Sequence, residues 1–305
     1  MKRSEFIKSS LLAGLAFSNG AYASLARGGK AAPSGKTFNL NYAPHEGMFA
    51  NLGGRDILDQ IRFMHDRGFR ALEDNGMLKR SAAEQEKIGN LLSKLGMQMG
   101  VFVVDAGDNW KTSLTTGKQE FKDNFLKACR ESVEAARRCN ARWLTVVPGF
   151  YERRLPVGIQ MSNVIDAMRR GAEIFEPHNL VMVIETLSDT PELFLQKTNE
   201  TYLVCKAVSS PSCKILYDIY HMQRTEGDIL ATMERCWDEI AYIQIGDNPG
   251  RKEPTTGEIN YKNIFSFLHK RGYRGVLGME HGNSLPGKEG EEALINAYRE
   301  VDGFI

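Results

Sequence analysis

The sequence predicts a closed (β/α)8 barrel, the TIM-barrel architecture of the α/β fold class. From Thr37 onwards, short runs rich in Val, Ile, Leu and Phe alternate with helix-length segments. This alternation is typical of parallel strands joined by helices that cover the sheet. The runs begin near eight positions, namely Phe38, Phe69, Met97, Arg142, Leu180, Lys214, Ile240 and Gly275. Eight such units over about 265 residues match the usual size of a barrel.

The helices are indicated by the spacing of their apolar residues and by the turns that follow them. The helix-length segments cover residues 55–68, 82–96, 119–139, 164–178, 225–239 and 260–272. Three of the following turns, HDRGFRAL, SKLGMQMG and HKRGYRGV, contain Gly68, Gly96 and Gly272. Glycine suits these places because the residue after a helix often has a positive φ.

An open, doubly wound sheet is the alternative to a closed barrel. Acid or amide residues end the last four predicted strands, and they can converge at one face of a barrel but would spread along a row in an open sheet. The chain contains neither G-x-G-x-x-G nor G-x-x-x-x-G-K-[ST], so no motif supports a nucleotide-binding sheet. The barrel is therefore favoured.

The N-terminal residues differ from the rest and predict export to the periplasm. Lys2, Arg3 and Lys8 precede a short apolar run, and Ala21-Tyr22-Ala23 has the pattern of a cleavage site. The segment resembles a twin-arginine signal in which Ser4 replaces the second arginine. We expect a signal peptide at residues 1–23, a flexible linker at 24–36 and one catalytic barrel at 37–305. A frayed helical extension or an uncleaved anchor is the alternative, although the run is too short to span a bilayer.

Charge and cysteine content exclude several classes of partner. A formal net charge of +1 gives no sign of a nucleic-acid or anionic-membrane surface. We therefore expect a small-molecule substrate, no nucleic acid, and no membrane contact after signal cleavage. The charge does not decide between a monomer and a homo-oligomer. The five cysteines form no C-x-x-C pair, and an odd number cannot all pair within one chain.

The four acid or amide residues that end the last strands predict a metal site. Glu185, Asp218, Gln244 and Glu280 each follow an apolar or β-branched run. Any one of them alone could be a helix cap or an ion-pair partner. Together, at the ends of consecutive strands, they would leave buried charge uncompensated unless a cation or a substrate were bound. An all-oxygen set favours Mg²⁺ or Mn²⁺ and leaves Zn²⁺ open.

Residues at the ends of the first strands are further candidates. His45 and Glu73 end the first and second strands, and we expect either to contact substrate, with hydrogen-bonded loop residues as the alternative. Trp110 and Phe150-Tyr151 follow the third and fourth strands, where aromatic side chains can form a wall of a sugar pocket.

Several motifs give the chain a family resemblance. They are YDIYHMQ at 217–223, IQIGDNPGRKEPTTGEINY at 243–261, GYRGVLGMEHG at 272–282 and, more weakly, VIETLS at 183–188. On these motifs, residues 37–303 resemble the sugar isomerase and epimerase superfamily with the xylose isomerase-like barrel, and most closely its hydroxypyruvate isomerase branch. The resemblance implies that Glu185, Asp218, Gln244 and Glu280 bind one divalent cation.

The resemblance also implies roles for individual residues. It implies that Glu185 and Glu280 form a proton-transfer pair beside the substrate. It places His221 and Arg251 at positions that hold substrate oxygens, and Glu258 belongs to the family signature GEINY. We include Glu258 and His45 with the predicted substrate-binding residues.

The chemistry of isomerisation explains these residue types. Moving a carbonyl along a hydroxy-ketone takes a proton from one carbon and returns it to the next through a cis-enediolate, so one carboxylate acts as base and another as acid. A cation stabilises the negative charge that develops. We therefore expect an isomerase, either an aldose-ketose intramolecular oxidoreductase or an epimerase, that acts on a small hydroxy-carbonyl compound or keto-sugar. A metal-dependent keto-glycoside lyase and a non-catalytic sugar-binding barrel are the alternatives.

The chain departs from the branch beside the predicted ligands. It has Thr186-Leu187-Ser188 where the branch usually has Pro-Leu-Asn, and His281 where the branch has an aromatic residue. We expect the metal site to persist and the substrate pocket to differ.

Overall fold

The computed structural model describes residues 35–305. The predicted signal peptide at 1–23 and all but the last two residues of the predicted linker at 24–36 lie outside the described residues, so both stay predictions.

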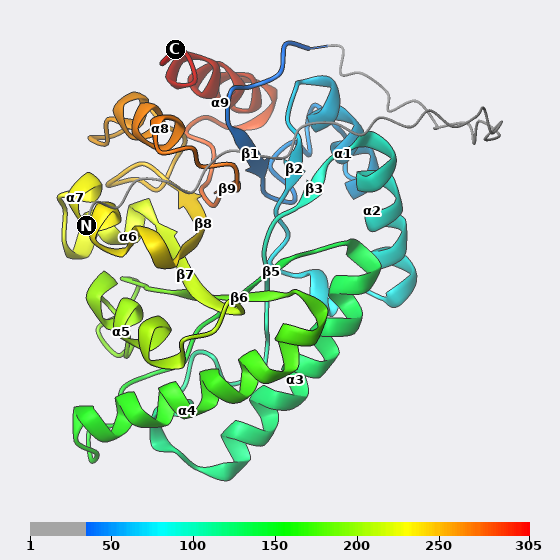
Figure 1. The fold of residues 1–305 in the computed structure, drawn as a ribbon. Helices are drawn as coiled ribbons and strands as arrows, with labels where there is room; N and C mark the ends of the chain where they lie inside the picture. The colour runs from blue at the N-terminus through cyan, green and yellow to red at the C-terminus, as the bar shows by residue number, and fades with distance from the viewer. Residues whose placement is uncertain (1–34) are drawn as a thin grey trace, which may run out of the picture.

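The strands are parallel and form a curled sheet around a common axis (Figure 1). Seven of them pair in the order β1-β9-β8-β7-β6-β5-β4, and β2 pairs with β3. The strands are β1 Asn41–Pro44, β2 Ala71–Leu72, β3 Gln98–Met99, β4 Phe102–Val103, β5 Trp143–Val146, β6 Val181–Glu185, β7 Cys213–Asp218, β8 Ile240–Ile245 and β9 Val276–Met279. A parallel bridge between His45 and Glu73 joins the ends of β1 and β2. The predicted (β/α)8 barrel is confirmed.

The third predicted strand is divided into β3 and β4 at Gly100. The first half pairs with β2 and the second with β5. A Cβ atom at Gly100 would lie 2.5 Å from the Tyr242 hydroxyl oxygen, which reaches this strand from β8. The strand therefore passes between its neighbours at a position where only glycine leaves room for the tyrosine.

Helices surround the sheet and connect its strands (Figure 1). They are α1 Ile57–Asp66, α2 Ala82–Leu95, α3 Gln119–Cys139, α4 Val157–Phe175, α5 Thr198–Val208, α6 Ile219–Thr225, α7 Ile229–Cys236, α8 Tyr261–Lys270 and α9 Gly287–Val301. Gly68, Gly96 and Gly272 have φ values of 92°, 70° and 74°, as the turn sequences predict. Within residues 35–305, no helix combines the length and apolar character needed to cross a bilayer.

Two apolar layers hold the barrel together. The larger lies between the strands and the helices, and the smaller fills the inside of the barrel. The inner layer consists of alanine and valine side chains with two larger ones, Leu216 and Tyr242. The alanines and valines are Ala43, Ala71, Val101, Val181, Val183 and Val276. Because side chains alternate between the two faces of a strand, the residue two positions further on points inward as well. The next inward-pointing positions, toward the carboxyl ends of the strands, are therefore those of the polar residues described below.

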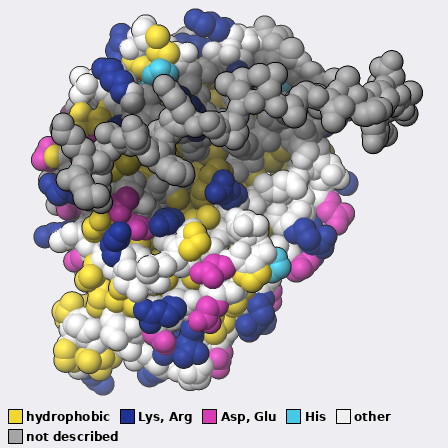
Figure 2. Space-filling view, in the orientation of Figure 1, with side chains coloured by type: hydrophobic (Ala, Val, Ile, Leu, Met, Phe, Trp, Pro, Cys, Tyr) yellow, Lys and Arg dark blue, Asp and Glu magenta, His cyan; other side chains and the backbone are white. Residues whose placement is uncertain are grey.

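Charged side chains of both signs are interspersed on the face shown in Figure 2. This view shows no large area of a single sign among its described residues. The pattern is in keeping with the balanced charge of the sequence.

Asp302 joins the C-terminal end of the chain to the first strand. It follows α9 and is buried. Its carboxylate accepts hydrogen bonds from the backbone N–H groups of Asn39 and Leu40 at 2.7 and 3.3 Å and from the Tyr42 hydroxyl at 2.9 Å. This contact fixes the start of β1, and through it the edge where β1 meets β9.

We predict that Asp302→Ala lowers the free energy of unfolding by about 2–4 kcal/mol, because it leaves buried donors without an acceptor. Urea denaturation at neutral pH measures the change. The control is Glu300→Ala, at an exposed position of α9, which we expect to change the free energy of unfolding by at most about 0.5 kcal/mol. Equal stabilities of the two variants would contradict the role given to Asp302.

Candidate active site

A cavity of about 410 Å³ lies at the carboxyl end of the strands. Its lining comes from loops that follow several strands, which is the usual construction of a barrel active site. Glu185, His221, Arg251 and Glu280 line it. Asn75, Lys79, Val103, Asp105, Trp110, Val147 and Leu187 are among the remaining lining residues.

The four predicted metal ligands come from four neighbouring strands. Glu185 ends β6, Asp218 ends β7, Gln244 lies near the end of β8, and Glu280 directly follows β9. The strand register sets Asp218 level with Gln244, and Gln244 level with Gly278. Each lies two or four residues beyond an inner-layer residue of its strand, so all point into the same end of the barrel.

Asp218 is fixed by the helix that follows it. It is the N-cap of α6, and its Oδ1 accepts hydrogen bonds from the backbone N–H groups of Tyr220 at 2.7 Å and His221 at 3.3 Å. A carboxylate at a helix N-terminus satisfies donors that the helix cannot. The cap leaves Oδ2 directed at the cavity side, where it meets Arg251.

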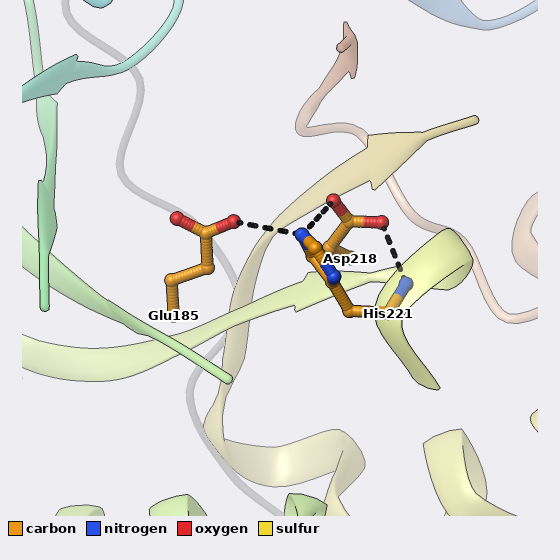
Figure 3. Close-up of side chains that lie close together, drawn as sticks. All are labelled: Glu185, Asp218 and His221. Atoms are coloured by element: carbon orange, nitrogen blue, oxygen red, sulfur yellow. Dashed lines mark hydrogen bonds and ion pairs between the residues drawn. The ribbon is translucent and has the colours of Figure 1, made fainter. Parts of the chain in front are cut away.

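Several buried polar atoms of this cluster lack a hydrogen-bond partner among the described residues. They are Glu185 Oε1, Gln244 Oε1 and His221 Nε2. Glu185, Asp218 and His221 each place one polar atom within 4.8 Å of the others, and they point toward one another from β6, β7 and α6 (Figure 3). Unpartnered buried polar atoms are costly, so a ligand that satisfies them is expected here. The carboxylate oxygens of Glu185 and Asp218 are ligands that suit a divalent cation, while the full set with Gln244 and Glu280 stays a prediction.

His221 presents a donor to the site. Its Nδ1 lies 3.2 Å from the backbone nitrogen of Ser188 and 2.8 Å from the Ser188 hydroxyl. Because a backbone N–H only donates, Nδ1 accepts, and the neutral ring carries its proton on Nε2. Burial lowers the pKa of His221 and favours that neutral ring. The Nε2–H group lies 3.5 Å from Asp218 and 3.9 Å from Glu185, which suits a donor to a substrate oxygen better than a metal ligand.

Arg251 lies among the carboxylates. Its Nη2 is 2.7 Å from Glu280 Oε2 and 3.1 Å from Asp218 Oδ2, and its guanidinium stacks on Tyr220 with 5.0 Å to the ring centroid. The surrounding carboxylates, chiefly Asp218 and Glu280, outweigh burial and raise the pKa of Arg251. A planar cation that lines the cavity is well suited to bind substrate oxygens.

The structure does not bring every predicted residue to the cavity. Asp218 and Gln244 are buried and are not among the described residues that line it. Within 35–305, His45 and Glu258 do not line it either. Glu258 is exposed and accepts hydrogen bonds from Asn248 and Gln223 at 2.5 and 3.2 Å. The Nδ1 of His45 lies beside the backbone oxygen of the next residue. Their substrate-binding roles stay predictions.

Other lining residues are absent from the sequence-based set. Asn75 donates to Glu280 Oε1 at 2.7 Å, and Lys79 pairs with Asp105 at 3.1 Å. Asn75 and Asp105 stand at the ends of the second and third predicted strands, and that position is the signal that could have found them. Trp110 does line the cavity and is half exposed, whereas Phe150 and Tyr151 are not among the residues that line it.

The two predicted proton-transfer residues have raised pKa values. Burial, with the neighbouring carboxylates Glu280 and Asp218, raises the pKa of Glu185 well above its usual range. Burial raises the pKa of Glu280 to about 8, although Arg251 opposes the shift. Carboxyl groups whose pKa lies closer to neutrality suit general acid and base chemistry.

Comparison with known proteins decides the family. The family model described as xylose isomerase-like TIM barrel matches residues 61–301. The chain belongs to this family. Hydroxypyruvate isomerase from Escherichia coli is 31% identical over 182 residues, covering 58% of this chain and 67% of that protein. A 2-oxo-tetronate isomerase from Haemophilus influenzae is 26% identical over 232 residues, covering 74% and 87%.

Solved structures agree on the fold. An AP endonuclease of family 2 from Brucella melitensis superimposes with a TM-score of 0.71 at 24% identity, covering 82% of this chain and 96% of that one. A 3-keto-D-glucoside 4-epimerase from E. coli gives 0.71 at 16% identity, covering 86% and 99%. At these identities the likeness shows the fold alone. The relatives at higher identity are isomerases, and this chain is an enzyme of the isomerase and epimerase class.

We predict that divalent cations bind more tightly as the pH rises from 6 to 8. With its pKa at about 8, the Glu280 carboxyl holds a proton below that pH in the cation-free protein. The proton must leave before the oxygen can bind a cation, so the Glu280 proton alone should make the apparent affinity rise by up to about tenfold per pH unit below pH 8. Calorimetry with Mn²⁺ in buffers of different ionisation enthalpy measures both the affinity and the protons released. An affinity independent of pH between 6 and 8 would contradict this prediction.

Proposed function

We propose that this protein is a divalent-metal-dependent isomerase or epimerase of a small hydroxy-carbonyl compound or keto-sugar. In this proposal Glu185 and Glu280 transfer a proton between neighbouring carbons of the substrate. The observation that carries it is a pair of carboxyl groups with raised pKa that line one cavity, with the Asp218 carboxylate close to both.

The cation would be held by Glu185, Asp218, Gln244 and Glu280. When bound, it supplies Lewis-acid chemistry that makes the substrate C–H more acidic and stabilises the enediolate. Mg²⁺ or Mn²⁺ is favoured because all four ligands offer oxygen, whereas Zn²⁺ more often takes nitrogen or sulfur ligands.

The two glutamates differ in how they are held. Both oxygens of Glu280 accept hydrogen bonds, one from Asn75 and the other from Arg251, so its carboxyl group is fixed in orientation. Glu185 keeps Oε1 free of hydrogen bonds among the described residues. This oxygen is the atom best placed to take up and return a proton, because no donor competes for it.

In this proposal His221 and Arg251 orient the substrate. The Nε2–H group of His221, set by Ser188, would donate to a substrate oxygen. Arg251 offers a planar fork that matches a carboxylate or adjacent hydroxyl groups. The names of the relatives, hydroxypyruvate isomerase and 2-oxo-tetronate isomerase, support a small hydroxy-carbonyl acid as one substrate class.

We predict that Glu185→Gln and Glu280→Gln each reduce the exchange of solvent deuterium into the substrate by at least about a hundredfold, because an amide cannot move the proton. The assay incubates hydroxypyruvate or a keto-sugar with the Mn²⁺-loaded enzyme in D₂O and follows deuterium by mass spectrometry.

The matched control is Glu131→Gln, on the exposed face of α3 and outside the cavity lining. It should exchange like the wild type. Circular dichroism checks that the two site variants are folded. Undiminished exchange in either folded site variant would overturn the proposed proton-transfer pair.

A further inference from the structure

We propose that Glu73 is a positioning residue that, with Tyr242, fixes the amide of Gln244 so that its Oε1 faces the cation. The inference rests on the proposed cation-dependent function. It assigns a role to a carboxylate that the proton-transfer chemistry does not use.

Glu73 is buried inside the barrel. It follows β2, has none of its surface exposed, and is absent from the described residues that line the cavity. Its backbone N–H donates to Pro44 O at 3.0 Å, which fixes it against β1. The side chain extends across the inside of the barrel to β8. Glu73 therefore acts through another residue and does not touch the substrate.

The hydrogen bonds of Glu73 determine which end of the Gln244 amide faces the site. Gln244 Nε2 donates to Glu73 Oε1 at 2.8 Å, and the Tyr242 hydroxyl donates to Glu73 Oε2 at 2.7 Å. Both oxygens of Glu73 accept in this arrangement, so the NH₂ group of Gln244 faces Glu73. The Oε1 atom of Gln244 is then left without a hydrogen-bond partner among the described residues. An oxygen is the atom a hard cation requires, whereas an NH₂ group would repel it.

Two glycines leave room for this arrangement. A Cβ atom at Gly278, on β9, would lie 1.9 Å from Glu73 Oε2. A Cβ atom at Gly100 would lie 2.5 Å from the Tyr242 hydroxyl oxygen. Any larger residue at either position would displace the carboxylate or the tyrosine. β9 and the segment between β3 and β4 thus each have a glycine where the Glu73–Tyr242 pair needs the space.

The position of Gln244 explains why an amide suits this place. Its side chain lies between a buried carboxylate and the candidate cation site. A carboxylate at 244 has no N–H group to donate to Glu73, but an amide offers a donor to one side and an acceptor to the other. Carboxylates orient metal-binding histidines in the same way, and loss of such a partner typically costs about 10-fold to 100-fold in metal affinity.

The test measures Mn²⁺ affinity by calorimetry for the wild type and Glu73→Gln. In the variant, the amide introduced at position 73 can donate to Gln244 Oε1 and turn the Gln244 amide around, so we expect Mn²⁺ to bind about 10-fold to 100-fold more weakly. The matched control is Glu291→Gln. Glu291 is a buried carboxylate too, but it accepts hydrogen bonds from Asn51 and Leu52. This control should lower the melting temperature and leave Mn²⁺ affinity unchanged.

A reciprocal double variant separates positioning from a general structural role. In Glu73→Gln with Gln244→Glu, the new amide donates to the new carboxylate, whose second oxygen faces the cation. We expect this pair to bind Mn²⁺ within about tenfold of the wild type. If Glu73→Gln does not fold, Glu73→Asp replaces it, since the shorter side chain cannot reach Gln244 and should weaken binding similarly.

The outcomes distinguish this inference from the proposed function. Wild-type affinity in the folded Glu73 variant, or failure of the double variant to recover binding, overturns the positioning role while the cation-dependent function stands. A wild-type protein that binds no Mn²⁺ overturns both. Weakened binding in the single variant with recovery in the double variant establishes the role of Glu73.

Discussion

The mutual repulsion of carboxylates at one end of the barrel is the constraint on which the site depends. Glu185, Asp218 and Glu280 are held on neighbouring strands whose direction and register leave them no freedom to separate. Charges of one sign at short range in a poorly solvated place raise one another's pKa or require a compensating charge. Both responses are present here, since burial together with the neighbouring carboxylates raises the pKa values of Glu185 and Glu280, and Arg251 pairs with Asp218 and Glu280.

The residues around the carboxylates are organised by this constraint. Asn75 and Arg251 hold Glu280, and the N-terminus of α6 holds one oxygen of Asp218. Arg251 has a φ of 48°, in a region that most residues avoid. Asp247 stabilises its loop by accepting hydrogen bonds from backbone N–H groups further along the same loop, at 2.9 and 3.1 Å. The loop therefore places the guanidinium of Arg251 beside the carboxylates at the ends of the strands.

The sequence predicted the parts of the site that follow from strand periodicity. Glu185, Asp218, Gln244 and Glu280 could be found because each ends a recognisable apolar run, and parallel strands bring their carboxyl ends to one face. The helix-to-strand turns could be predicted because a positive φ has a strong residue preference. These features depend on the local sequence and on the parallel arrangement of strands in a barrel.

The remaining features depend on contacts between residues far apart in the chain. Glu73 was expected to contact substrate, but its partner Gln244 lies 171 residues away, and no spacing rule connects them. The same holds for Ser188 and His221, whose contact sets the tautomer of the ring. Glu258 belongs to a recognisable motif, yet it lies outside the described lining of the cavity because loop conformation, not strand alternation, decides where it points.

The most direct test of the central claim is a crystal structure of the protein soaked in Mn²⁺, with anomalous scattering to locate the metal. The proposed site predicts one strong peak bounded by oxygens of Glu185, Asp218, Gln244 and Glu280, with Gln244 bound through Oε1. A peak held by His221 Nε2 in place of Gln244, or no peak at this end of the barrel, would contradict it.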